Sequence, residues 1–196
     1  MNKLLTKLRS VAKKAAQVEV ETNDKVLGIG LCTSVARGDV WSASDIDFLV
    51  VSEDVENRKF RTESFEGVHV DWHFYGRKYV DRLIEGYPQS FGEKRLPNLL
   101  YECVTLYDPQ SYLKKAHQFA EKHRFSLEVV SLRAQNAVAR GRTELEKCQE
   151  CLKEAEYVPA ILCAREASFW AAAALIELDK KVIHQKEVHP TVKVRS

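Results

Sequence analysis

Three aspartates stand out as residues that could do chemistry together. Asp45 and Asp47 open an apolar run that ends at Val51, and alternate side chains of a strand point to opposite faces, so these two carboxylates share one face. Neighbouring carboxylates on an otherwise apolar strand repel each other and lose hydration. A hard divalent cation such as Mg²⁺ relieves that repulsion, because it prefers carboxylate oxygens.

A third carboxylate lies in the next apolar run, residues 68–75. Alternation places Asp71 on one face with His69 and His73, and sends the apolar residues between them to the core. If the two strands are neighbours, the three aspartates can hold two Mg²⁺ ions about 4 Å apart, the spacing used for in-line displacement at phosphorus. The alternative is structural: a solvated loop before one strand and an exposed edge on the other.

Ten residues separate a hydroxyl-rich turn, which ends at Ser34, from Asp45. Thr33 and Ser34 are followed by Ala36, Arg37 and Gly38. A turn of this kind offers backbone N–H groups and hydroxyls to a phosphate. Arg37 is either a phosphate contact or a loop cation.

The combination resembles the DNA polymerase β-like nucleotidyltransferase superfamily, in particular its small prokaryotic and antibiotic-modifying members. The resemblance covers residues 26–108 and is carried by Ser34-Val35-Ala36-Arg37-Gly38, Asp45-Ile46-Asp47 and Asp71. Thr33 departs from the pattern, because the family has glycine there. Glycine allows a positive φ and a close approach of the backbone to phosphate.

This resemblance implies an α+β fold, in which a nucleotidyltransferase-type mixed sheet with flanking helices precedes an all-α helical bundle. We expect a catalytic domain over residues 1–108 and a helical substrate-binding or partner domain over 109–196. The implied reaction transfers a nucleoside monophosphate, expected to be AMP from ATP, to an acceptor hydroxyl and releases pyrophosphate.

The resemblance also implies roles for single residues. Two Mg²⁺ ions, with Mn²⁺ as a substitute, would be held by Asp45, Asp47 and Asp71. The nucleotide would be bound by Thr33, Ser34 and Arg37. A different class of function stays open, a binding or regulatory protein of antitoxin type that keeps the fold with weakened turnover. Thr33 favours that alternative, whereas the three aspartates argue against it.

The elements that must position these residues follow from hydrophobic spacing. Helices are expected over residues 4–15, 35–38, 77–85, 111–123, 127–155 with an interruption near Gly141, and 157–179. Strands are expected over 26–32, 45–51, 59–66, 68–75 and 99–107, with Phe60 and Phe65 anchoring the third. Residues 19–25 and 87–97 are expected to be linker and loop, and the tail from Lys180 has no assignment.

Glu166 lies on an apolar helical stripe with Leu162, Phe169 and Ala173. A carboxylate among residues that favour burial must reach a polar partner. Glu166 is therefore a candidate general base for the acceptor hydroxyl, with an ion pair to Arg165 as the alternative. Cys148 and Cys151 are more consistent with core packing than with half of a zinc site, because no second pair has the required spacing.

Composition limits the partners. The chain has 196 residues and a net charge of +2, which argues against a long nucleic acid and favours a small molecule or protein as acceptor. An RNA-end transferase would need a basic patch that composition does not indicate. Five cysteines without framework spacing, no membrane-length apolar run and a basic N-terminus without an apolar signal region predict a cytoplasmic protein. A homodimer is compatible with the sequence.

Overall fold

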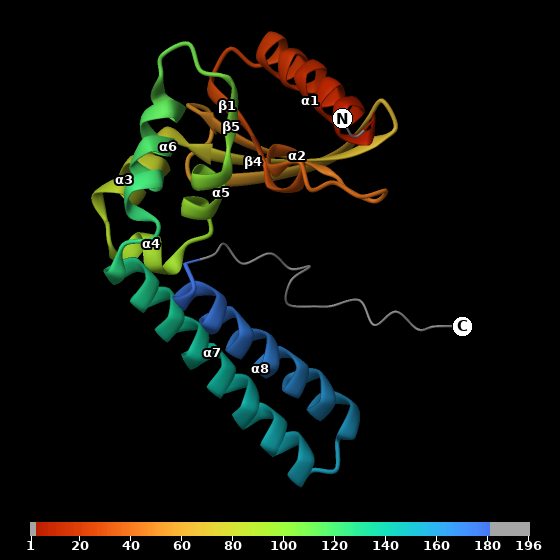
Figure 1. Ribbon diagram of the computed structural model, residues 1–196, viewed down its shortest axis with the longest axis vertical. Coiled ribbons are helices and arrows are strands. Elements are labelled where there is room, and N and C mark those ends of the chain that lie inside the picture. Colours follow the sequence, from red (N-terminus) through yellow and green to blue (C-terminus); the bar gives the residue numbers. More distant parts are fainter. Residues whose placement is uncertain (1–2, 181–196) are drawn as a thin grey trace. The chain divides into compact units, whose positions relative to one another are not determined.

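A five-stranded mixed sheet carries the acid-bearing strands in the computed structural model, which describes residues 3–180 (Figure 1). Its strand order is β3-β4-β2-β1-β5. The strands are β1 (Val26–Cys32), β2 (Ile46–Ser52), β3 (Arg58–Phe65), β4 (Val68–Gly76) and β5 (Val104–Tyr107). β2 and β4 are parallel, and every other neighbouring pair is antiparallel. The expected α+β fold is confirmed.

A tight hairpin explains how β4 comes to lie beside β2. Glu66 and Gly67 both have positive φ, 49° and 75°, which is the backbone conformation of a two-residue hairpin that matches the strand twist. β3 therefore takes the edge of the sheet, and β4 lies between β3 and β2. The edge position agrees with the polar sequence of β3, in which exposed and half-buried residues alternate.

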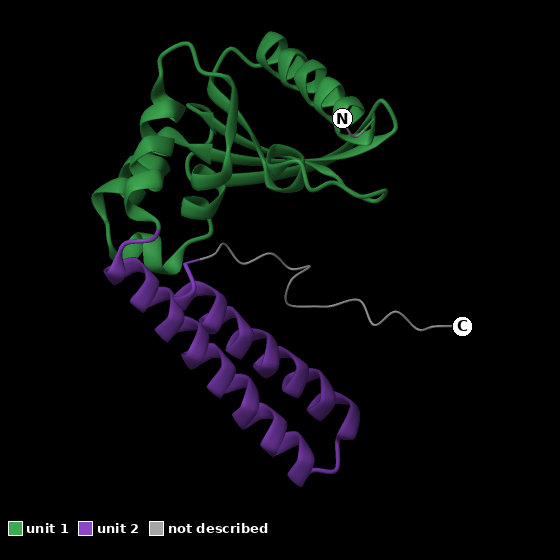
Figure 2. Cartoon of the chain, viewed as in Figure 1, with its two compact units in different colours: residues 1–124 green, residues 125–196 purple. Residues whose placement is uncertain are grey.

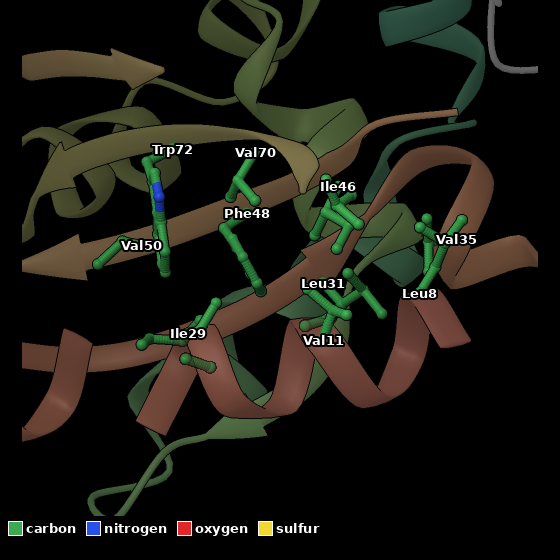
Figure 3. Close-up of a cluster of buried hydrophobic side chains, with 14 of the residues drawn as sticks. Leu8, Val11, Ile29, Leu31, Val35, Ile46, Phe48, Val50, Val70 and Trp72 are labelled. Carbon is green, nitrogen blue, oxygen red and sulfur yellow. The ribbon is translucent and has the colours of Figure 1, made fainter. Parts of the chain in front are cut away.

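Helix α1 (Lys3–Thr22) covers one face of the sheet (Figure 3). Its apolar stripe, which includes Leu8 and Val11, packs against side chains that point to this face from the three central strands. Those strand residues are Ile29, Leu31, Ile46, Phe48, Val50, Val70, Trp72 and Phe74. Since Ile46 and Trp72 belong to this core, the residues that alternate with them must point to the other face.

Helices also lie on the opposite face of the sheet. The helices that follow the sheet strands are α3 (Arg77–Glu85), α4 (Gln89–Glu93), α5 (Leu96–Glu102) and α6 (Tyr112–His123). A Cβ on Gly28 would lie 2.9 Å from that of Leu113, and one on Gly30 would lie 3.0 Å from that of Cys103. Glycines in β1 thus let α6 and the end of α5 approach the sheet backbone closely.

The last two described helices form a hairpin of their own. They are α7 (Leu127–Lys153) and α8 (Tyr157–Leu178). The chain divides into two compact units, residues 1–124 and 125–196 (Figure 2). This division lies sixteen residues beyond the boundary expected at 108, because α6 packs on β1 and α5 and so belongs to the first unit.

Several local expectations were wrong. The segment 87–97 contains α4 and the start of α5, and Leu99 lies in a helix, so only residues 104–107 of the expected last strand pair with β1. Gly141 does not interrupt α7. Phe60 is 56% exposed and anchors nothing in the core, whereas Phe65 does pack against it. The tail beyond Lys180 lies outside the described residues.

Helix α1 also extends beyond the expected residues 4–15, so that Glu19, expected in a linker, lies within the helix. Its carboxylate is buried, and Arg61 of β3 donates to it at 2.5 Å. The Arg61 guanidinium in turn lies over the rings of Trp72 and Phe74, at 4.9 and 5.2 Å. One ion pair therefore ties the last turn of α1 to the edge of the sheet.

This contact predicts the effect of removing one carboxylate. Glu19→Ala should lower the free energy of unfolding by about 2 kcal/mol, because the partly buried guanidinium of Arg61 loses its closer carboxylate and is left with Glu63 at 3.5 Å. Urea unfolding followed by circular dichroism measures the change. Glu21→Ala is the matched control, since Glu21 is exposed on the same turn and pairs with Gln17; it should change stability by less than about 0.5 kcal/mol. Equal effects of the two changes would contradict this account.

Candidate active site

The parallel pairing of β2 with β4 brings two of the predicted aspartates together. Asp47 is the register partner of Asp71, and Cys32 of β1 is the partner of Asp47 on its other side. Directly paired residues point to the same face of a sheet, so both carboxylates lie on the face away from α1. Asp45 immediately precedes β2 and is half-buried. Asp47 and Asp71 thus share one face, whereas Asp45, which was expected on the same strand, lies just before it.

The Asp47 carboxylate is 12% exposed and has two partners. Thr33 Oγ1 donates to one oxygen at 2.5 Å, and His73 Nε2 lies 3.4 Å from the other. Burial alone would raise the pKa of Asp47, but the hydrogen bonds from His73 and Thr33, together with the charge of Arg95, lower it overall. Asp47 is therefore held as an anion inside the protein.

Asp71 and Asp45 complete the acidic group. Thr62 Oγ1 of β3 donates to Asp71 at 2.6 Å, and His69 Nε2 lies 3.2 Å from the same oxygen. Burial, followed by the negative charges of Asp47 and Asp71, raises the pKa of Asp45. The carboxylates are thus close enough to repel one another. A divalent cation bound between them would relieve that repulsion.

The donor chemistry of this face fits a hard cation. Oxygen ligands on neighbouring strands suit Mg²⁺ or Mn²⁺. Within residues 3–180, no three His, Cys, Asp or Glu side chains are already arranged to hold a metal ion. Four side chains contact the aspartate oxygens: Thr33 and His73 lie at Asp47, and Thr62 and His69 lie at one oxygen, Oδ1, of Asp71. Each carboxylate oxygen has two lone pairs, so hydrogen bonds of this kind can orient a carboxylate that also binds a cation.

The turn after β1 has an unusual backbone. Thr33 has φ 56°, a left-handed conformation that β-branched residues rarely adopt and that glycine adopts freely. It is the position at which the family pattern has glycine. Thr33 begins the short helix α2 (Thr33–Arg37), whose buried second residue is Ser34.

Helix α1 supports this turn from behind. Arg9 donates to the carbonyl oxygens of Val35 and Ala36 at 3.3 and 3.1 Å, which satisfies groups at the end of α2. Gly38 then ends the helix with φ 89°, and its N–H donates to the Ser34 carbonyl. The first turn of α2 is thereby fixed beside Asp47.

Arg37 is engaged with protein carboxylates in this structure. Its Nη1 lies 3.2 Å from both oxygens of Glu102 in α5, and its Nη2 lies 3.1 Å from Asp39. The Glu102 side chain is 7% exposed, so the pair is a link between α2 and α5. A phosphate would have to compete with two carboxylates for this guanidinium.

Glu166 lies in the second unit. Within α8 its side chain is 41% exposed and accepts from Arg165 Nη2 at 2.9 Å. The ion pair considered as an alternative is therefore present. The buried carboxylate of α8 is Glu177, which pairs with Arg133 of α7.

Three contributors to the site were missed in the sequence. Thr62 and Arg9 cannot be identified from the sequence, because their hydrogen bonds to Asp71 and Val35 depend on which strands and helices lie side by side. Arg95, an exposed residue just before α5, lies close enough for its charge to lower the pKa of Asp47. The sequence offered no signal for it beyond its place in a segment expected to be a loop.

A family model for the nucleotidyltransferase domain matches residues 14–125. The chain belongs to this family. The match includes all three aspartates and the Thr33 turn, and it confirms the resemblance to the DNA polymerase β-like superfamily. None of the helices within residues 3–180 is both long and apolar enough to cross a membrane.

A solved structure supports the same fold. It is the crystal structure of a nucleotidyltransferase-like protein from Exiguobacterium sibiricum 255-15, with 14% sequence identity and a TM-score of 0.52. The similarity covers 89% of this chain but only 60% of that one, so this nucleotidyltransferase-family chain spans about three fifths of its relative's length. No curated protein matches the chain.

The backbone at Thr33 leads to a prediction about stability. Thr33→Gly should be more stable than Thr33→Ala by about 1 kcal/mol, because both lose the hydroxyl but only alanine keeps a Cβ at positive φ. Chemical denaturation of the two variants measures the difference. Ala36, in the helical part of the same turn, is the matched position: Ala36→Gly should be destabilising by up to about 1 kcal/mol. A Thr33→Ala variant that is the more stable of the two would contradict the left-handed assignment.

Proposed function

We propose that this nucleotidyltransferase-family protein is a metal-dependent enzyme that transfers AMP from ATP to an acceptor hydroxyl and releases pyrophosphate. The observation that carries the proposal is the pairing of Asp47 with Asp71 on a sheet face that helix α1 leaves free. Asp45 lies next to them, and its pKa is raised in part by their charges. A purely structural role would not require three carboxylates to be held against their mutual repulsion.

The triphosphate would lie against the first turn of α2. The N–H groups that begin a helix have no intrahelical partners, so they are available to phosphate oxygens. Ser34 adds a hydroxyl in that turn, and Thr33 holds the turn next to Asp47. We assign to Arg95 the role of a phosphate-neutralising cation, because it is exposed and its charge reaches Asp47. Arg37 would contribute after exchange with Glu102.

The aspartates would hold Mg²⁺ or Mn²⁺ through carboxylate oxygens whose remaining lone pairs are not used by Thr33, His73, Thr62 and His69. When bound, the cation supplies positive charge to the phosphoryl group and lowers the pKa of the attacking hydroxyl. The chain itself orients the carboxylates by strand register and keeps Asp47 ionised through its hydrogen bonds. With a net charge of +2, the chain favours a small molecule or protein acceptor over a long nucleic acid.

A binding or regulatory protein with weakened turnover is the second candidate. It is favoured by the hydrogen bond from Thr33 to Asp47, which a glycine at this position could not make. Calorimetry with ATP separates the two candidates. The enzyme should bind ATP with an affinity that depends on Mg²⁺, whereas binding that Mg²⁺ leaves unchanged would favour the regulatory protein.

The acceptor can be found by a direct transfer assay. The purified chain would be incubated with Mg²⁺ and ATP labelled at the α-phosphate, together with aminoglycosides, proteins or tRNA in separate reactions. Label that moves to one class of acceptor identifies the substrate. Label that moves to none of them, in a preparation that binds ATP with Mg²⁺, would count against transfer to these three classes.

Asp47→Asn is expected to reduce transfer by at least about 10²-fold, because an amide cannot supply the negative charge that a divalent cation requires. Circular dichroism should show a fold like that of the parent chain. Asp24→Asn is the control, since Asp24 is an exposed acid that contacts only its neighbour Lys25 in an ion pair; turnover should be unchanged. Parent-like turnover of Asp47→Asn in Mg²⁺ would show that the acid pair has been wrongly assigned.

Glu166→Gln tests the proposed base. If Glu166 takes the proton from the acceptor hydroxyl, this change should lower turnover by about 10²-fold while ATP binding persists. Glu154→Gln, at an exposed carboxylate just after α7, should leave turnover as it is. A Glu166→Gln variant with full turnover and a lower melting temperature would show that Glu166 is not the base and acts only through its ion pair with Arg165.

A further inference from the structure

Helix α8 carries more large apolar side chains than its packing against α7 covers (Figure 1). Small residues lie at the contact between the two helices, where Ala173 and Ala174 of α8 are buried with Ala137 of α7. A helix with apolar residues on all sides is normally covered on all sides. Six large apolar side chains of α8 are instead between 49% and 70% exposed: Tyr157, Val158, Ile161, Leu162, Leu175 and Leu178.

Seven exposed residues of α8 form one straight stripe along the helix. They follow one another in alternating steps of four and three residues, which is the spacing of a coiled-coil seam. None of them is charged: they are Tyr157, Ile161, Ala164, Ser168, Ala171, Leu175 and Leu178. Large side chains thus lie at both ends of the stripe and small ones at its middle. Since small side chains let two backbones approach closely, the stripe can pack against a second helix along its whole length.

An apolar groove continues this stripe onto α7. The groove has a volume of about 530 Å³ and is lined by α7 residues that include Leu127, Ala134 and Val138, and by Leu178 of α8. Leu127 and Val138 are exposed, as Leu178 is. Because Leu178 belongs to both features, the stripe and the groove lie on the same side of the hairpin. Together they form one continuous apolar surface.

The first unit has no comparable surface in the part that the structure describes. The exposed large apolar side chains within residues 3–124 are Val18, Trp41, Phe60 and Val104. They lie on α1, in the loop before β2, on β3 and on β5, so they are separated in the chain and belong to different elements. Single exposed apolar residues are ordinary, whereas a continuous patch marks a docking surface.

We propose that a second copy of this chain covers the stripe and the groove, so that two α7–α8 hairpins form a four-helix bundle with the two α8 helices antiparallel. A two-fold axis requires that the same surface be complementary to itself. The stripe meets this requirement. When one copy is reversed, the large residues at each end meet those at the opposite end, and Ala164 meets Ala171 at the closely packed middle.

The same arrangement fills the groove. The middle of the stripe lies at Ser168, so an antiparallel second copy brings its own Tyr157 within one turn of Leu178. This level of α8 is beside the groove, because Glu177 pairs with Arg133 of α7. Tyr157 of the second copy can therefore enter the groove, and symmetry provides a second insertion. Buried aromatic anchors of this kind contribute much of the binding free energy at protein interfaces.

The size of the surface also fits a dimer. Six large apolar side chains would face the second copy, and each removes on the order of 100 Å² from water when it is buried. With the small side chains between them, each copy contributes roughly 700 Å², close to the roughly 800 Å² per partner of a standard stable interface. The six are Leu127, Val138, Tyr157, Ile161, Leu175 and Leu178.

The mass of the full chain in solution tests the proposal. Light scattering after size-exclusion chromatography at about 10 μM should give twice the chain mass of 22.4 kDa, since interfaces of this size have micromolar or tighter affinity. Leu175→Lys should raise the dissociation constant at least about tenfold, because it places two unpaired charges in the interface. Its circular dichroism should match that of the parent, because Leu175 is 69% exposed in the single chain.

Leu162→Lys is the matched control. Leu162 is also exposed on α8, at 49%, but lies on the side of the helix away from the stripe. This variant should dimerise like the parent. Tyr157→Ala should weaken the dimer by at least about tenfold, because the groove loses its aromatic anchor.

Cysteine cross-linking tests the antiparallel orientation. Ser168→Cys should form a disulfide between two copies under mild oxidation, because a residue near the two-fold axis meets its own counterpart. Leu175→Cys should not link to itself, because the antiparallel arrangement separates the two copies of position 175 by about 20 Å along the helices. Mass spectrometry of the linked peptides distinguishes these products from links through the native cysteines.

Several results would overturn the proposal. A monomer at about 100 μM would mean that the tail or an unlike protein covers the surface, since a dimer of this interface area would have formed. A dimer that Leu175→Lys leaves intact, or that Leu162→Lys weakens equally, would contradict the assigned face. Linking of position 175 to itself as fast as position 168 would contradict the antiparallel arrangement.

Discussion

The parallel pairing of β2 with β4 is the constraint on which the candidate active site depends. Parallel neighbours cannot be joined by a tight turn, so the chain must pass through an intervening element. Here that element is the edge strand β3, and the hairpin at Glu66 and Gly67 returns the chain as β4 in the place beside β2. The resulting register sets Asp47 directly against Asp71. A slip by one residue would send Asp71 into the core under α1.

Two carboxylates in this position need compensation, and each neighbouring strand provides some. β1 ends at the partner of Asp47, so the next residue, Thr33, reaches the carboxylate. β3 places Thr62 opposite Asp71, and β4 itself adds histidines on either side. A bound cation would add its charge to this compensation at the lone pairs that these contacts leave. Thr33 makes its contact from a backbone conformation that favours glycine.

The acidic residues of the site could be predicted from the sequence more readily than the residues that hydrogen-bond to them. Period-two alternation was sufficient to place Asp71, His69 and His73 on one face, because the burial of β4 follows the same alternation. The spacing between Ser34 and Asp45 identified the turn. By contrast, the hydrogen bonds from Thr33 and Thr62 depend on strand order and register, which a list of strands does not contain.

The wrong predictions of helices and strands share a physical cause. Glu19 looked like a linker residue because its partner, Arg61, is 42 residues away in the sequence. The apolar run that begins at Leu99 predicts one strand, since a short apolar run does not distinguish a buried helix from a strand. Glycine at position 141 predicts a break in the helix, but it allows close packing against Trp170 of α8. In each case a contact distant in sequence decided the local structure.

The central claim is that Asp45, Asp47 and Asp71 together hold divalent cations beside a nucleotide. Anomalous diffraction from crystals grown with Mn²⁺ and a non-hydrolysable ATP analogue tests it most directly. The account predicts manganese peaks in contact with these carboxylates. Bound nucleotide without manganese at the aspartates would contradict it.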